Sequence, residues 1–253
     1  MEENPRLWEI FLDVQRGLPR QGPGCDDATR KALSLCSGLP DKPRVLDIGC
    51  GPGMQTVVLA QEVHGHITAV DICEEYLDQL KARVEKAGAT DRVEVLALDM
   101  NELAFPEHHF DLIWAEGSAY IMGFAHALDA WRPLLKPGGY LAVTELVWLA
   151  PERPAKAATF FADAYPAMTD VTSVADMFRM QGYELVGHFT LPDAAWWEDY
   201  YTPLSEKLPK LREKYRDDHE ALRVVETTRQ EIETRRLFGD SFGYEFFVGQ
   251  PGR

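Results

Sequence analysis

Three glycines at alternate positions follow the first strongly apolar segment of the chain. Residues 45–48 read Val-Leu-Asp-Ile, and residues 49–53 read Gly-Cys-Gly-Pro-Gly. The apolar segment predicts a buried strand, and residues 54–63 predict a helix directly after it. Because glycine lacks a Cβ atom, the backbone of such a turn can approach a ligand closely, and the free N–H groups of the following helix point toward the same place.

The rest of the chain alternates apolar segments with helical patterns, which predicts an α/β fold with a doubly wound, mostly parallel sheet. We expect the helix at 126–135 to stop at Pro137-Gly138-Gly139, and a charged helical region at about 205–237 to begin near Pro209. The remaining predicted strands are 67–70, 93–98, 110–115, 140–147, 183–191 and 242–248, and the remaining predicted helices are 74–87 and 172–181.

Composition narrows the functional class. The chain has 253 residues, of which 45% are hydrophobic and 26% charged, so we expect a single globular domain over residues 1–253. Lys plus Arg number 26 and Asp plus Glu number 41, which gives a net charge of −15. Nucleic-acid binding depends on neutralising phosphates with Lys and Arg, so this balance disfavours a DNA or RNA substrate.

The N-terminal sequence MEENPRLWEI is acidic where a secretory signal would be basic, so we expect a cytoplasmic protein. The most apolar stretch, residues 141–150, is too short to span a membrane. The four cysteines are widely spaced and are expected to be reduced thiols. The spacing of the histidines predicts no metal site.

Two acidic residues stand where predicted strands end. Asp71 follows the strand at 67–70, and Asp99 follows Leu98 at the end of the strand at 93–98. Ligands of doubly wound sheets bind beyond the carboxyl ends of the strands, where Asp71 can accept hydrogen bonds from both ribose hydroxyls of a nucleoside. Each aspartate can alternatively serve only as a cap for the segment that follows it.

The spacing D-x-G-x-G-x-G of residues 47–53 resembles the first motif of the class I S-adenosylmethionine-dependent methyltransferases. A dinucleotide-binding turn would have its third glycine at Met54, so a nicotinamide-dependent dehydrogenase is the weaker alternative. Residues 110–114 and 135–141 resemble the fourth-strand and fifth-strand motifs of the same methyltransferase family. The resemblance covers residues 41–148 in order and in spacing.

This resemblance implies a Rossmann-like sheet of seven strands, with the last strand inserted antiparallel at the sheet edge. It divides the chain into an N-terminal helical lid segment (1–40), a cofactor-binding half (41–150) and a substrate-side half (151–253) with a long helical insertion at about 193–238. Residues 17–24 and 116–120 also resemble a subgroup of small bacterial and archaeal members.

The resemblance further implies S-adenosyl-L-methionine as cofactor and S-adenosyl-L-homocysteine as product. Asp71 would hold the ribose, and Ile72 would flank the adenine. The residues themselves suggest that Arg20 pairs with a carboxylate of cofactor or substrate, unless 18–24 is only a rigid surface loop. Glu116 is expected to contact the methionine amino group or the substrate, or alternatively to be a solvated loop carboxylate. The full set of expected cofactor-binding residues is Asp47, Gly49, Cys50, Gly51, Gly53, Asp71, Ile72, Asp99, Met100, Glu116 and Arg20.

The implied activity is methyl transfer by in-line displacement to a small-molecule acceptor, with O, N, S and C left open as the methylated atom. Tyr120, His126 and Glu145 are weak candidates for a general base, so no catalytic residue is assigned. An aromatic cluster at helical spacing predicts either core packing or a wall of the acceptor pocket, where ring faces would favour a cation. It comprises Trp196, Trp197, Tyr200 and Tyr201.

Two further alternatives concern the class of protein and its oligomeric state. A non-catalytic S-adenosylmethionine-binding module would share the same turn but lack an acceptor pocket. The charged helical region at 205–237 is expected to be a solvated face, or alternatively the contact of a homodimer.

Overall fold

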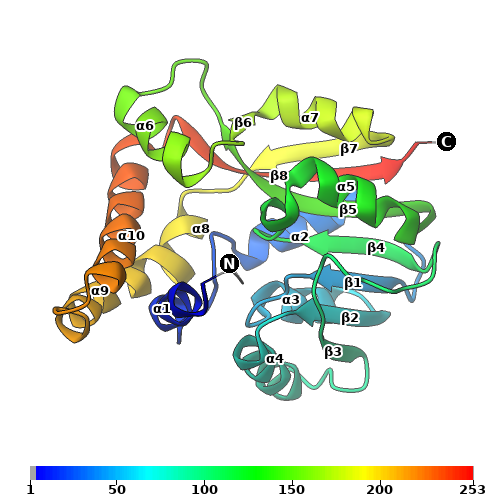
Figure 1. Ribbon diagram of the computed structural model, residues 1–253. Helices are drawn as coiled ribbons and strands as arrows, with labels where there is room; N and C mark the ends of the chain where they lie inside the picture. The colour runs from blue at the N-terminus through cyan, green and yellow to red at the C-terminus, as the bar shows by residue number, and fades with distance from the viewer. Residues whose placement is uncertain (1–3, 253) are drawn as a thin grey trace.

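A computed structural model describes residues 4–252, so residues 1–3 of the expected lid segment and residue 253 lie outside the described residues. The chain forms one sheet in the order β3-β2-β1-β4-β5-β8-β7, with the two-residue strand β6 paired to β5 (Figure 1). The strands are β1 (Arg44–Ile48), β2 (His66–Asp71), β3 (Val93–Ala97), β4 (Phe110–Ala115), β5 (Leu135–Trp148), β6 (Thr169–Asp170), β7 (Tyr183–Thr190) and β8 (Phe242–Pro251).

The predicted Rossmann-like, mostly parallel sheet with an antiparallel last strand is confirmed. Strands β1 to β5 pair in parallel, and β8 is antiparallel to both β5 and β7. The expected place of the last strand was wrong, because β8 lies between β5 and β7 and not at the edge. Its adjacent residues Phe246 and Phe247 are both fully buried, which requires cover on both faces of the sheet.

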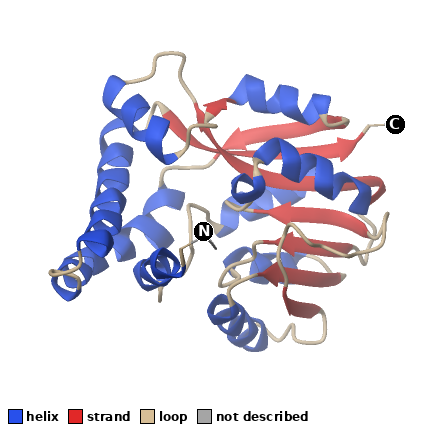
Figure 2. Ribbon diagram, viewed as in Figure 1, coloured by secondary structure: helices blue, strands red, loops and turns tan. Residues whose placement is uncertain are grey.

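Helices cover both faces of this sheet (Figure 2). The helices α2 (Asp26–Leu35), α3 (Met54–Glu62) and α4 (Glu74–Lys86) pack on one face, and α5 (Phe124–Trp131) and α7 (Val171–Met180) pack on the other. Val45 and Leu46 alternate between the two cores, as expected for a strand that is buried on both faces.

The helix expected at 126–135 ends earlier than predicted. Helix α5 stops at Trp131 and is followed by a short 3-10 turn, η2 (Arg132–Leu134). Pro133 explains the early end, because it has no N–H to donate to the Asp129 carbonyl and so cannot continue the helical hydrogen bonds. Residues 137–139 lie instead within β5.

A separate group of helices packs beside the carboxyl ends of the strands (Figure 1). It consists of α1 (Pro5–Gln15), α6 (Ala155–Ala164), α8 (Ala194–Trp196), the π-helical turn η3 (Trp197–Tyr201), α9 (Thr202–Lys214) and α10 (His219–Phe238), which share a third apolar core. We call this set the helical cap.

The expected start near Pro209 was wrong. Helix α9 already begins at Thr202, so Pro209 lies inside it. An internal proline removes one helical hydrogen bond. Leu204, Leu208 and Leu211 on the same helix are buried in the core of the helical cap, and this apolar burial stabilises α9 in spite of the proline.

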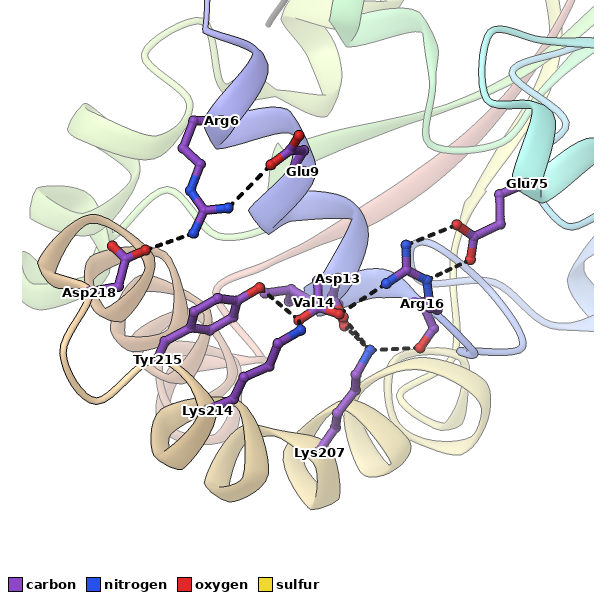
Figure 3. Close-up of polar contacts among 10 residues, drawn as sticks. All are labelled: Arg6, Glu9, Asp13, Val14, Arg16, Glu75, Lys207, Lys214, Tyr215 and Asp218. Atoms are coloured by element: carbon purple, nitrogen blue, oxygen red, sulfur yellow. Dashed lines mark hydrogen bonds and ion pairs between the residues drawn. The ribbon is translucent and has the colours of Figure 1, made fainter.

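Within the helical cap, helix α1 is fixed to α9 through its last turn (Figure 3). The Lys207 ammonium of α9 donates to the backbone carbonyls of Asp13, Val14 (3.0 Å) and Arg16 (2.7 Å). A cation is favourable at a helix C-terminus, where carbonyls lack partners within the helix. On its other side, the Arg16 guanidinium donates to Glu75 of α4 at 2.8 Å, so α1 connects the cap to the first half of the sheet domain.

Two further features of the described chain concern its cysteines and its helices. All four cysteines are free thiols, as predicted. Within residues 4–252, none of the helices combines the length and the apolar character that crossing a bilayer requires.

Candidate functional site

The glycine turn between β1 and α3 has an unusual backbone. Gly49, Gly51 and Gly53 have φ angles of 69°, 52° and 85°. For residues with a Cβ atom, this left-handed region costs roughly 1–2 kcal/mol each. The turn therefore needs glycine at these positions for its conformation alone.

The three glycines differ in what surrounds them. A Cβ atom on Gly49 would lie 2.4 Å from Ser118 Cβ, and one on Gly53 would lie 2.1 Å from Leu80 Cδ1. A Cβ atom on Gly51 would meet only Gln21 Cγ, at an ordinary 3.6 Å. Packing within the protein thus requires glycine at positions 49 and 53, whereas a Cβ atom at Gly51 would meet no steric conflict.

Asp71 ends β2 directly beside this turn. Its carboxylate accepts hydrogen bonds from the backbone N–H groups of Gly51 at 2.8 Å and Cys73 at 2.9 Å. Burial raises the pKa of the Asp71 carboxyl. Each carboxylate oxygen retains a further lone pair for a ligand. The next residue, Ile72, leaves 52% of its surface exposed, which gives the strand end an apolar surface.

Asp47 does not lie where a cofactor contact requires it. It is fully buried, and its carboxylate accepts hydrogen bonds from the Thr56 hydroxyl at 2.6 Å and the Gln55 amide at 3.3 Å. Burial raises the pKa of Asp47 to about 7. The predicted direct contact is therefore corrected: Asp47 holds the first turn of α3 in place. The buried Cys50 acts similarly, since its carbonyl accepts from Gln55 at 2.9 Å.

Asp99 and Met100 lie after β3. One Asp99 oxygen accepts from both the backbone N–H and the side-chain amide of Asn101, at 2.8 and 2.7 Å, so the aspartate closes a local turn. The Met100 methyl lies 3.5 Å from the Cβ position of Gly49, which places this side chain against the glycine turn. Sequence analysis singled out Asp99 by its position at a strand end, and included Met100 only through the family resemblance.

Arg20 and Glu116 are paired with each other. Glu116 accepts from Arg20 at 3.4 Å, the Thr29 hydroxyl at 2.7 Å and the Trp114 indole N–H at 2.9 Å. Arg20 also donates to Asp26 at 3.0 Å. Both the Arg20 and the Glu116 side chains are only 5% exposed. Arg20 thus has carboxylate partners within the chain, Glu116 and Asp26.

The loop of residues 17–24 carries a polar side chain that sequence analysis missed. Both polar atoms of the Gln21 amide are buried and have no hydrogen-bond partner, and Gln21 lies beside Gly51. The loop is tied to the helical cap, because the Gly24 N–H donates to the Ala195 carbonyl at 3.0 Å. A buried amide without partners is costly, so Gln21 is placed to bind a ligand at the turn. Its only sequence signal was its place in this loop.

The three weak catalytic candidates lie in different surroundings in the structure. His126 is exposed on the outer side of α5, whose Phe124 and Leu128 face the core, and its role as a base stays a prediction. Tyr120 and Glu145 lie on either side of Tyr165. The Tyr120 and Tyr165 ring centroids are 5.7 Å apart, and the Tyr165 hydroxyl donates to Glu145 at 2.5 Å.

The predicted aromatic cluster lies in the core of the helical cap. Trp196, Tyr200 and Tyr201 are 2%, 6% and 1% exposed, which fits the core-packing alternative. The Tyr201 hydroxyl nevertheless donates to the Glu231 carboxylate at 2.6 Å, so the cluster is not purely apolar. Trp197 is partly buried, and its indole N–H donates to Asp193 outside this core at 3.0 Å.

Across residues 4–252, the His, Cys, Asp and Glu side chains form no group of three or more that is placed to hold a metal ion.

The family model described as a methyltransferase domain matches residues 45–139, less than half of the chain. A curated relative, 27-O-demethylrifamycin SV methyltransferase from Amycolatopsis mediterranei, is 31% identical over 131 residues. That alignment covers 48% of this chain and 46% of the relative. The chain thus spans about half the length of this curated relative.

Solved structures match over nearly the whole length. A methyltransferase from Geobacter sulfurreducens in complex with S-adenosyl-L-homocysteine has a TM-score of 0.78 at 21% identity and covers 98% of each chain. The [4+2]-cyclase SpnF has a TM-score of 0.72 at 19% identity and covers 97% of this chain and 92% of its own. The same fold therefore carries different activities. The matched motif segment, the strand order and the glycine turn agree with one another: residues 45–139 form a methyltransferase domain of the class I, S-adenosylmethionine-dependent type.

Proposed function

We propose that this protein transfers a methyl group from S-adenosyl-L-methionine to a small-molecule acceptor by in-line displacement. One observation carries the proposal: the unpacked side of Gly51 faces an unpartnered Gln21 amide, and the Asp71 carboxylate lies 2.8 Å from the Gly51 N–H. A nucleoside that carries a charged amino-acid group would place its ribose at Asp71 and its amino-acid part at Gln21. The names of the matched relatives support the same activity.

Each part of the cofactor has residues suited to it. The Asp71 carboxylate has acceptor capacity left for ribose hydroxyls, and the exposed Ile72 offers an apolar surface to the adenine. Met100 and Asp99 border the same end of the sheet. The Gln21 amide and the loop around it would hold the methionine part, and the Arg20–Glu116 pair would fix the loop in position.

The bound cofactor supplies a methyl group on a sulfonium, an already activated leaving group. The protein then has to align the acceptor atom with the carbon–sulfur bond and exclude water, and good alignment alone can contribute roughly 7–11 kcal/mol. We propose residues 1–40 as the lid that performs this task, residues 41–150 as the cofactor-binding half and residues 151–253 as the acceptor side.

We propose that the protein acts in the cytoplasm. We also propose that its acceptor is a small molecule and not a nucleic acid. The net charge of −15 supports this, since it opposes binding to phosphate backbones. The exposed charged side of α10 includes Arg229, Arg236 and Glu233, and it suits a solvated surface. A homodimer through this surface remains the alternative that a sedimentation measurement decides.

Calorimetry with S-adenosylhomocysteine and with NADH tests the proposal. We expect saturable binding of the nucleoside thioether and none of NADH. Binding of NADH in place of S-adenosylhomocysteine would favour a dehydrogenase and contradict the proposal. Binding of S-adenosylhomocysteine without release of that product from S-adenosylmethionine on any acceptor panel would favour a non-catalytic module.

A further inference from the structure

A second polar cluster lies next to the glycine turn, between the sheet and the helical cap. It gathers side chains from α1, the 3-10 turn η1 (Ala119–Met122), β5, the residue after α6, η3, α10 and β8. We call it the tyrosine–glutamate cluster, and its members are Gln15, Tyr120, Glu145, Tyr165, Tyr200, Tyr201, Glu231 and Tyr244.

Two carboxylates of this cluster have tyrosine partners and no cation. Glu145 is 3% exposed, and one of its oxygens accepts from Tyr165 at 2.5 Å. Glu231 accepts from Tyr201 at 2.6 Å. Burial raises the pKa of both carboxyls, and no Lys, Arg or His within the described chain contributes to either shift. Burial without a cation favours the protonated form of each carboxyl, and a cation bound beside it would favour the ionised form.

The unpartnered atoms of the cluster are hydrogen-bond acceptors. The second oxygen of Glu145 is buried and has no partner, and the same holds for the amide oxygen of Gln15, a residue that is 5% exposed. The Gln15 side chain lies beside the Tyr200 hydroxyl. Leaving such acceptors unpaired in the protein interior is unfavourable. A ligand that donates several hydrogen bonds would remove this cost.

Tyr120 places the cluster within reach of solvent and of the glycine turn. It leaves 42% of its surface exposed, although burial of its hydroxyl raises its pKa to about 12. The carboxylates of both Glu145 and Glu231 also raise that pKa, so Tyr120 lies near both. Two residues earlier, Ser118 packs against Gly49 and donates to the Ile48 carbonyl at 2.7 Å. The cluster therefore adjoins the proposed cofactor site.

We infer that the methyl acceptor is an amine that enters as an ammonium ion, and that Glu145 accepts its proton. The unpartnered Glu145 oxygen would take this proton, and the ring faces of Tyr120 and Tyr165 would favour the cation. The freed nitrogen lone pair then forms the N–CH3 bond while the carbon–sulfur bond breaks and sulfur keeps its electron pair. The products are an N-methylammonium ion, S-adenosylhomocysteine and protonated Glu145. This inference rests on the proposed methyltransferase function.

The test uses full-length protein saturated with S-adenosylhomocysteine and a set of matched fragment trios. Each trio has one skeleton with an amine, an alcohol or a carboxylate, beginning with phenethylamine, 2-phenylethanol and 3-phenylpropionate. By calorimetry we expect binding of amines, and at least tenfold weaker binding of the alcohol and the carboxylate. If no trio shows this preference for the amine, the inference is overturned.

Two single substitutions test whether the amine binds at Glu145. Glu145→Gln should weaken amine binding at least tenfold while S-adenosylhomocysteine affinity stays within twofold, which also shows that the variant is folded. Glu245→Gln is the matched control, because Glu245 pairs with Glu145 across β5 and β8 but has both oxygens bound, by His188 and Thr190. Equal effects of the two substitutions would contradict the role of Glu145. Failure of S-adenosylhomocysteine to bind would instead contradict the proposed function itself.

Discussion

The carboxylate of Asp71 accepts the backbone N–H of Gly51 at 2.8 Å, which joins the end of β2 to the turn after β1. The same carboxylate holds the Cys73 N–H at the start of α4. One side chain therefore fixes the relative positions of two helix starts and still has lone pairs available for a ligand.

Replacing Asp71 should weaken cofactor binding. Asp71→Ala removes the proposed ribose contact, and we expect a loss of about 1.5–3 kcal/mol in S-adenosylhomocysteine affinity by calorimetry, the range for hydrogen bonds to charged groups. Asp71→Asn keeps an acceptor for Gly51 and serves as the control for the shape of the turn. A folded Asp71→Ala protein with unchanged affinity would refute the ribose role.

The three turn glycines should respond differently to alanine. Gly49→Ala and Gly53→Ala create contacts of 2.4 and 2.1 Å with Ser118 and Leu80, so we expect them to lower the urea midpoint strongly. Gly51→Ala meets only Gln21 and should cost roughly 1–2 kcal/mol of stability through its backbone conformation. Its main effect should be weaker cofactor binding, and Gly51→Val should abolish binding. Equal stability losses across the series would argue against this distinction.

Arg20 should matter more than a typical surface arginine. Arg20→Met leaves the buried Glu116 without its cation, and we expect a loss of about 3–5 kcal/mol in the free energy of unfolding. The loop at 17–24 should also become more accessible to hydrogen exchange. Arg30→Met is the control, because Arg30 is 41% exposed in its ion pairs and should cost less than about 1 kcal/mol. Similar losses in the two variants would contradict the buried role of Arg20.

Stability should depend on pH through Glu145. Burial raises its pKa to about 8, so between pH 4.5 and 8 the unfolded chain releases a proton that the folded protein keeps. The free energy of unfolding therefore falls as pH rises through this window and levels off above it. Relative to Glu145→Gln, the wild type should lose on the order of 3 kcal/mol between pH 5 and 8, at about 1.4 kcal/mol per pKa unit. Parallel pH profiles in urea titrations would disprove this assignment.

Sequence patterns predicted the sheet and the turn because those features depend on residues that lie close together in the sequence. The continuous buried run of β1, the spaced glycines and the acid at the end of β2 are all visible within short segments. The missed partners come from distant segments: Thr29 lies 87 residues from Glu116. Tyr165 and Glu231 gave no local signal, since their chemistry comes from burial against other elements.

The three carbonyls bound by Lys207 have a consequence for biosynthesis. Helix α1 is made first, yet the residue that holds its last turn is 191 positions further along the chain. At typical translation rates, the nascent segment waits on the order of 10–40 s before its partner emerges from the ribosome. During that interval the apolar side of α1, with Ile10 and Val14, is unprotected, so a chaperone that holds this segment would favour correct closure over aggregation.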